Sequence, residues 1–199
     1  MSFSGKVKEE LSRQISTARH CQIAEIAAIL SVCGQVSISA NDHFCVTVHT
    51  ENVSVARKYF TLVEKTFNIE AVIHVRKNVY LKKSNVYRVE VPSHEDTVRI
   101  LQATKFMSPE QEIADDLSVM SRLVIQKECC KRAFLRGTFL AAGSISDPEK
   151  GYHLEIVCST MERAEQIQSI MKEFELDARI VTRKKNQVVY LKAVSYTHL

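Results

Sequence analysis

Basic side chains recur on two segments whose alternating pattern predicts β-strands. Apolar residues take alternate positions there, Ile73 and Val75 in the first segment and Ile180 in the second. If these apolar residues face a core, their polar neighbours point together to the other side. Strand-borne arginine and lysine suit contacts to DNA phosphates, and arginine can also read guanine. The candidate contacts to double-stranded DNA are His74, Arg76, Lys77, Lys82, Lys83, Arg88, Arg179, Arg183, Lys184, Lys185 and Lys192.

The same basic residues also fit a plainer interpretation, as solvated sheet edges that resist aggregation. Glu90 and Glu155 fall on the same polar alternation and weaken a positive field. A surface that binds a protein or a ligand instead of DNA would show an exposed apolar or mixed-charge patch. Both interpretations stay open at the level of these residues.

The cysteines do not follow the spacing of a known metal site. They are Cys21, Cys33, Cys45, Cys129, Cys130 and Cys158. None forms a CxxC pair, and no histidine lies at zinc-finger spacing from them, so the sequence predicts neither a metal nor a cofactor. We assign Cys129 and Cys130 to helix packing and His153 to a strand surface. No Ser-His-Asp arrangement and no phosphate-cradling glycine loop is present.

Composition indicates an ordinary globular chain. Its 199 residues are 45% hydrophobic and 25% charged, with a formal net charge of +4 that is compatible with nucleic acid. The start lacks the apolar segment of a signal peptide, and no apolar run reaches the ~20 residues of a membrane span. We expect a cytoplasmic, nucleoid-associated protein with reduced thiols and no membrane partner.

Two glycine-ended helices are expected to position the strands. The first covers residues 22–33 before Gly34, and the second covers residues 129–142 before Gly143. Small residues four positions apart form a face on each helix that lets another helix approach closely. Arg136, with its basic neighbours Lys131 and Arg132, is expected to point away from this face. The small residues are Ala24, Ala28, Ala133, Gly137 and Ala141.

The two helices open two copies of one repeat. Gly34 and Gly143 lie 109 residues apart, and at that offset Ala24 matches Ala133. A hairpin, a helix and a second hairpin follow each glycine, which gives a tandem α-β-β-α-β-β order. The offset later becomes 107, which equates Arg76 with Arg183.

Two capping boxes predict further helix starts. One lies in the linker at residues 108–111, and the other opens the second helix of the second copy at residues 159–162. A helix from Ser93 to Thr104 closes the first copy. The second copy stops before its counterpart, which should leave part of a sheet face uncovered.

The expected organisation follows from the repeat. A helix and connector fill residues 1–20, the first repeat spans 21–104, a linker spans 105–128, and the incomplete second repeat spans 129–193. Residues 194–199 resemble the translation of a common sequencing adapter, so we expect the natural protein to be longer.

The repeat resembles the LAGLIDADG homing-endonuclease fold. Residues 135–143 lie over its nine-residue motif and share Leu135, Gly137, Ala141 and Gly143 with it, and residues 26–34 take the same place in the first repeat. Longer strings, at residues 2–11, 127–133 and 147–156, resemble the WhiA family of bacterial regulators. The resemblance implies an α+β fold in which two antiparallel sheets form a saddle around paired central helices.

The resemblance also bears on chemistry. LAGLIDADG nucleases hold divalent metal with an acidic residue just before each motif's last glycine, where this chain has Cys33 and Ala142. Neither residue suits a hard cation, so we expect no enzyme activity, and a live nuclease is the disfavoured alternative. The family implies roles in transcription control, sporulation, cell division and chromosome segregation, with DNA and other transcription or division proteins as partners. A helix-turn-helix domain, absent from this sequence, is expected to carry most of the sequence recognition.

Overall fold

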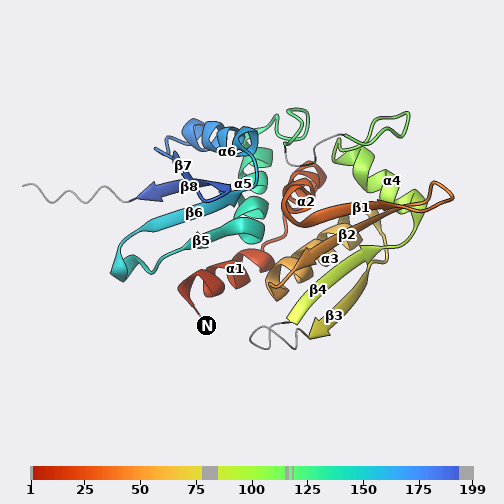
Figure 1. Cartoon of the computed structure of the whole chain (residues 1–199), viewed down its shortest axis with the longest axis horizontal. Helices are drawn as coiled ribbons and strands as arrows, with labels where there is room; N and C mark the ends of the chain where they lie inside the picture. Colours follow the sequence, from red (N-terminus) through yellow and green to blue (C-terminus); the bar gives the residue numbers. More distant parts are fainter. Residues whose placement is uncertain (1, 78–84, 115–116, 118, 193–199) are drawn as a thin grey trace, which may run out of the picture.

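A computed structural model describes residues 2–77, 85–114, 117 and 119–192 (Figure 1). The helices are α1 (Phe3–Arg13), α2 (Arg19–Cys33), α3 (Val53–Phe67), α4 (His94–Ala103), α5 (Glu128–Ala142) and α6 (Met161–Glu173), with a 3-10 turn at Pro148–Lys150. The strands are β1 (Gly34–Ile38), β2 (Phe44–Thr50), β3 (Val72–Lys77), β4 (Asn85–Val91), β5 (Gly143–Ile145), β6 (His153–Cys158), β7 (Arg179–Arg183) and β8 (Asn186–Lys192).

The strands form two antiparallel four-stranded sheets on either side of the central helices (Figure 1). The strand order is β1-β2-β4-β3 in the first sheet and β5-β6-β8-β7 in the second, so both copies have the same topology. Ile73 pairs with Val89 and Ile180 pairs with Val189, which are equivalent places in the two sheets. The α+β repeat and the equivalence of Arg76 with Arg183 are therefore confirmed.

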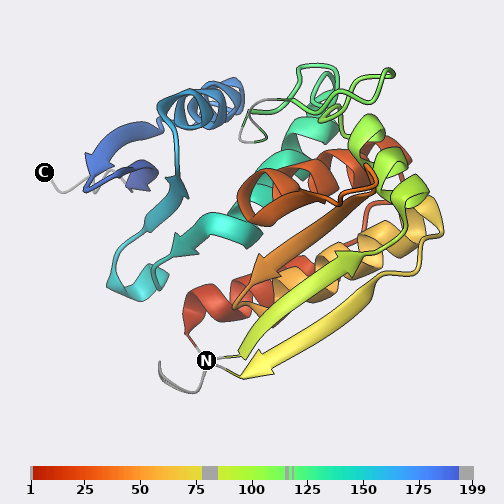
Figure 2. The ribbon, with the colours of Figure 1, turned by 45° about the vertical axis from the view of Figure 1, so that its right-hand side comes forward.

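The central helices α2 and α5 lie side by side, in orange-red and teal in Figure 2. Ala24, Ala28, Ala133 and Gly137 are buried between or beside them, whereas Ala141 is half-buried. A Cβ atom on Gly137 would lie 2.8 Å from the Ala28 Cβ atom, too close for any real contact. The close helix approach predicted from small residues is confirmed.

Each central helix ends at its glycine because the chain turns sharply there into a strand. Gly34 and Gly143 have ordinary extended φ angles of −79° and −87°, so neither is a left-handed cap. A Cβ atom on Gly34 would lie 2.3 Å from the Leu30 carbonyl oxygen, and one on Gly143 would lie 2.3 Å from the Phe139 ring. Close approach, rather than backbone freedom, requires glycine at both positions.

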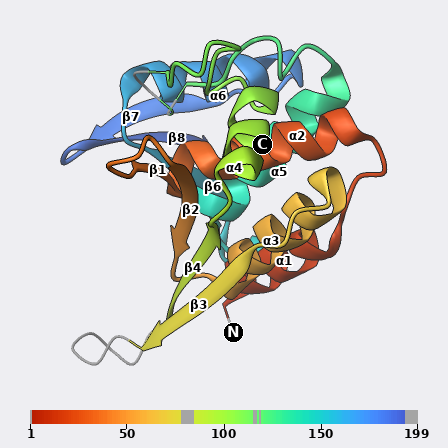
Figure 3. The same cartoon turned by 90° about the vertical axis from the view of Figure 1, so that its right-hand side faces the viewer.

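Helices cover one face of each sheet. In the first repeat α3 and α4 contact β2 and β4, while α1 lies against α3 (Figure 3). In the second repeat α6 covers β6, β7 and β8, and the described residues contain no counterpart of α4. Tyr152 is 56% exposed, whereas Phe44, which stacks on His94 of α4 at the equivalent place, is 9% exposed. That the second repeat stops before a matching helix stays a prediction.

Three local expectations are wrong in detail. Ile73 and Val75 do not reach a core: they share a face with buried Val89, but β3 is an edge strand beyond the helices and leaves them 41% and 57% exposed. Residues 108–111 form a turn instead of a helix, closed by a bridge between residues 107 and 113. The cap of α6 is Thr160, whose hydroxyl oxygen accepts the backbone N–H of residue 163.

Candidate nucleic-acid interface

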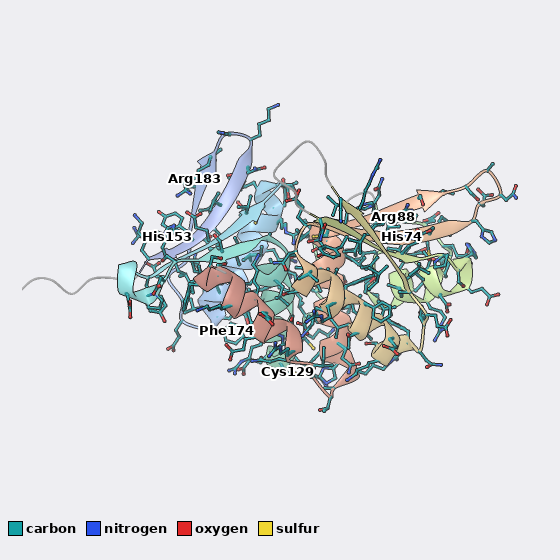
Figure 4. All side chains as sticks on the ribbon, turned by 90° about the horizontal axis from the view of Figure 1, so that it is seen from below. His74, Arg88, Cys129, His153, Phe174 and Arg183 are labelled. Atoms are coloured by element: carbon teal, nitrogen blue, oxygen red, sulfur yellow. The ribbon has the colours of Figure 1, made fainter. Side chains whose placement is uncertain are left out.

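The predicted basic residues lie mainly on the sheet faces turned away from the helices. Residues directly opposite each other in an antiparallel pair share a face. His74 pairs with Arg88 on the first sheet, on the side opposite buried Val89. Figure 4 shows these side chains on one sheet and Arg183 with His153 on the other. We call these two surfaces the outer faces.

The candidates fall into two groups, one on each sheet. Lys82 and Lys83 lie outside the described residues. In the first sheet, Lys77 pairs with Asn85 at the strand end, on the face that includes Val89. Lys184 and Lys185 occupy the turn between β7 and β8. The pairing of the strands places six of the candidates on the outer faces: His74, Arg76, Arg88, Arg179, Arg183 and Lys192.

Carboxylates on both outer faces contact some of these basic side chains. Glu90 forms an ion pair with Arg88 at 3.0 Å, and its carboxylate lies 3.6 Å from the His74 Nε2 atom. Glu155 lies 2.5 Å from His153 and 2.6 Å from Arg183, and these two contacts, His153 first, lower the pKa of Glu155. The outer faces therefore carry mixed charge, and a phosphate group would compete with these carboxylates for Arg88 and Arg183.

An apolar row crosses the outer face of the second sheet. Val157 pairs with Val188, which pairs with Val181 on the edge strand. Val188 is buried, but Val157 and Val181 are 43% and 36% exposed. This row interrupts the polar surface between Arg183 and Arg179.

The ends of the central helices lack the groups that would hold a hard cation. Cys33 is half-buried, and burial raises its pKa to about 11 against the opposing charges of Arg163 and Lys8. The Arg163 guanidinium is buried and donates to the Ser31 carbonyl oxygen. A divalent cation here would meet two cationic side chains, and the described residues contain no cluster of carboxylates near it.

Arg136 does not point away from the helix pair, as the sequence led us to expect. Its Nε and Nη2 atoms donate to the two carboxylate oxygens of Glu25 on α2, at 2.9 and 3.0 Å. Lys58 of α3 lies 3.0 Å from the same carboxylate, and both Glu25 and Lys58 are fully buried. The sequence analysis did not predict this network. The only sign of it in the sequence was a single acidic residue, Glu25, within the apolar run of α2.

Two family profiles match most of the chain. The WhiA N-terminal LAGLIDADG-like domain matches residues 19–107, and the WhiA LAGLIDADG-like domain matches residues 131–197. The chain belongs to the WhiA family. The matches coincide with the two structural repeats.

Curated WhiA relatives extend beyond the length of this chain. The "Probable cell division protein WhiA" of Lachnoclostridium phytofermentans is 51% identical over 192 residues, which cover 96% of this chain and 61% of the relative. The protein of the same name from Desulforamulus reducens is 40% identical over 197 residues, covering 96% and 59%. The chain thus spans less than two thirds of these WhiA relatives.

Solved structures share the fold at low identity. Full-length DUF199/WhiA from Thermatoga maritima has a TM-score of 0.68 at 20% identity, covering 98% of this chain and 58% of that one. The homing endonuclease I-DmoI, in complex with DNA and Mn, has a TM-score of 0.60 at 12% identity, covering 92% and 100%. These similarities establish the LAGLIDADG-like WhiA fold. Within the described residues, no helix is both long and apolar enough to cross a membrane.

Proposed function

We propose that this chain is the DNA-contacting scaffold of a WhiA-type regulator that acts in transcription and cell division. We also propose sporulation and chromosome segregation as the processes that it serves, as the family resemblance implies. The partner is double-stranded DNA, which the outer faces contact through phosphates, while sequence recognition belongs to a helix-turn-helix domain outside this chain. Nucleoid association follows from DNA binding.

The observation that carries the proposal is the equivalence of Arg76 and Arg183. Each lies on the edge strand of its sheet, at the same register position and on the outer face. A duplex has pseudo-twofold symmetry of its backbone, so matched cations on two symmetric sheets suit its phosphates. The DNA-bound state of I-DmoI, which has the same fold, supports this use of the scaffold.

We propose that this scaffold binds DNA without cleaving it. The positions of the metal-holding acids carry Cys33 and Ala142, and Lys8 and Arg163 act on Cys33 from nearby. Hydrolysis of a phosphodiester by this fold needs oxygen ligands for a divalent metal. Those ligands are not at the helix ends in the described residues.

The test measures duplex binding by the 199-residue chain over a range of salt. We expect the double variant Arg76→Glu, Arg183→Glu to bind more weakly. The negative slope of log affinity against log salt should also become less steep by about two, because two phosphate contacts are lost. The control is Arg57→Glu with Lys172→Glu, which reverses two exposed charges on the helices behind the same sheets. Equal affinity in wild type and the Arg76/Arg183 variant would overturn the assignment of the outer faces.

A second candidate function is a protein-interaction surface that does not touch DNA. The exposed Val157 and Val181, beside the paired Glu155, form the apolar and mixed-charge patch that this function needs. It predicts no duplex binding by the folded chain even at low salt. The same salt series therefore separates the two candidates.

A further inference from the structure

Four side chains with metal-ligating atoms meet at the N-terminal ends of the two central helices. They are His20, Cys21, Cys129 and Cys130, and one ligand atom from each lies within 4.8 Å of all the others. His20 and Cys21 come from α2, and the other two come from α5. Among the described residues, this is the one group of three or more such side chains close enough to share an ion.

The cluster follows the internal symmetry of the chain. Cys21 and Cys130 lie 109 positions apart, as do His20 and Cys129, and this is the same offset as between Gly34 and Gly143. Each central helix therefore contributes two adjacent residues from its first turn. Because α2 and α5 run side by side from this end, equivalent residues of the two repeats come face to face.

The distances suit one tetrahedral ion. The His20 Nδ1 atom lies 3.2 Å from the Cys130 sulfur and 3.3 Å from the Cys21 sulfur. The Cys129 sulfur lies 4.0 Å from the same nitrogen. Zinc bonds of ~2.0–2.1 Å to nitrogen and ~2.3 Å to sulfur, at tetrahedral angles, imply about 3.6 Å between a nitrogen and a sulfur ligand. The three observed distances bracket that value.

We propose that His20, Cys21, Cys129 and Cys130 bind a structural zinc ion that joins the two repeats. Three thiolates and one imidazole are a common ligand set of closed, four-coordinate zinc sites. Thiolate ligands also select zinc over hard cations such as magnesium and calcium. Each cysteine releases its proton to solvent on binding, so three thiolates and one divalent ion leave the site with a net charge of −1.

The helix ends favour negative charge at this place. The N-caps of α2 and α5 are Ala18 and Lys127, and neither makes a side-chain cap hydrogen bond. The other four α-helices are each capped by a side-chain oxygen of Ser, Asn or Thr. Thiolates in the first turn of α2 and α5 would interact favourably with the positive helix ends that lack such caps.

Two of the four residues are buried and two are exposed, so an ion could enter from solvent and then be enclosed. Cys21 and Cys130 are 4% and 3% exposed, whereas His20 and Cys129 are exposed at the rim. His20 and Cys130 also line a small pocket of about 200 Å³ together with Lys127. The positive charge of Lys127 is opposite in sign to that of the thiolates. An ion can thus reach the inner thiols past the outer two ligands.

The proposed zinc site lies at the end of the helix pair opposite to Cys33 and Ala142. Cys21 and Cys33 are 12 positions apart on α2, which corresponds to about 18 Å along a helix. Figure 4 likewise shows Cys129 on the side of the molecule away from Arg88 and Arg183. The zinc ion would fix the relative position of α2 and α5, and with it the spacing of the two sheets, without touching the outer faces.

The test is the zinc content of the purified 199-residue chain, measured by plasma mass spectrometry after growth with added zinc and dialysis. We expect close to one zinc ion per chain in the wild type and at least a tenfold loss in Cys130→Ser. Cys129→Ser should lose zinc as well, and because Cys129 is exposed, this variant tests the site without disturbing buried packing. Cys45→Ser changes a half-buried thiol on β2 that is not part of the cluster, and this variant should keep its zinc.

Cobalt gives an independent readout of the ligands. Wild type loaded with Co²⁺ alone should show the visible absorption of a tetrahedral thiolate complex, and Cys129→Ser should weaken it whereas Cys45→Ser should not. Folded wild type without zinc, or equal zinc in wild type and both cluster variants, would overturn the proposal. An intact mass that reveals a disulfide within the cluster of the freshly purified protein would overturn it too.

Discussion

Arg136 of α5 binds Glu25 of α2 through two parallel hydrogen bonds of 2.9 and 3.0 Å, and so links the two repeats at the middle of the central helices. Lys58 approaches the same carboxylate from α3 at 3.0 Å and also donates to the Leu11 and Gln14 carbonyl oxygens. The Glu25 contacts raise the pKa of Arg136, although burial opposes them, so the guanidinium stays charged. One buried carboxylate thus connects α2, α3 and α5.

Loss of the Glu25 carboxylate should be costly. Glu25→Ala leaves Lys58 and Arg136 without their shared partner, and we expect the free energy of unfolding to fall by about 3–5 kcal/mol. Urea denaturation followed by circular dichroism measures this. The control is Glu9→Ala, which breaks the exposed pair with Arg13 and should cost under about 1 kcal/mol. Equal losses in the two variants would contradict the assigned role of the network.

Gly137→Ala separates helix propensity from helix packing. In an exposed helix this change would stabilise by about 1 kcal/mol. At Gly137 the added Cβ would lie 2.8 Å from both the Ala28 Cβ atom and the Glu25 carbonyl oxygen, so α2 and α5 must move apart. We expect a loss of about 1–3 kcal/mol in the free energy of unfolding. A gain in stability would mean that the helices are not held as close as the structure shows.

Much of the architecture could be predicted because the same sequence pattern occurs in both halves of the chain. The 109-residue offset between Gly34 and Gly143 predicted the repeat, the helix pair and the order of helices and strands along the chain, all of which are confirmed. The alternation around Ile73 predicted the shared outer face of His74 and Arg76. The exposure of Ile73 could not be predicted, because it depends on how far a helix extends over an edge strand.

Contacts between the repeats were harder to predict. Arg136 was expected to point away from α2, because a spacing pattern on one helix does not tell which buried acid lies opposite, 111 residues earlier. The cysteine spacing predicted no metal site, because the known zinc motifs place their ligands at short fixed spacings such as CxxC. Here the ligands form two adjacent pairs that lie 109 positions apart in the sequence. Alignment of the repeats does pair Cys21 with Cys130 and His20 with Cys129, and that comparison was the available signal for the cluster.

The helix ends at Cys33 and Ala142 should not support DNA cleavage. We expect no nicking of supercoiled plasmid by the chain with magnesium or manganese, because the described residues offer no carboxylate cluster there and Lys8 and Arg163 disfavour a cation. Agarose gel electrophoresis of the plasmid measures this. The prediction fails if cleavage is robust and a single change next to Gly143 abolishes it.

The Glu155 contacts should make stability depend on pH in a defined direction. Hydrogen bonds from His153 and then Arg183 lower the pKa of Glu155 below its ordinary value of 4.5. A carboxyl whose pKa is depressed by folding contributes stability that is fully present above its unfolded pKa and is lost as pH falls through the folded one. The difference in free energy of unfolding between wild type and Glu155→Gln should therefore be constant above about pH 5 and shrink at lower pH.

Urea titrations of both proteins at a series of pH values measure this difference. Glu149→Gln is the control, because Glu149 is exposed in the turn after β5 and its change should leave the same pH dependence as the wild type. A difference between wild type and Glu155→Gln that grows as the pH falls below 4.5 would have the wrong sign. It would show that Glu155 is not held ionised by His153 and Arg183, and these two side chains would then be available to phosphate on the outer face.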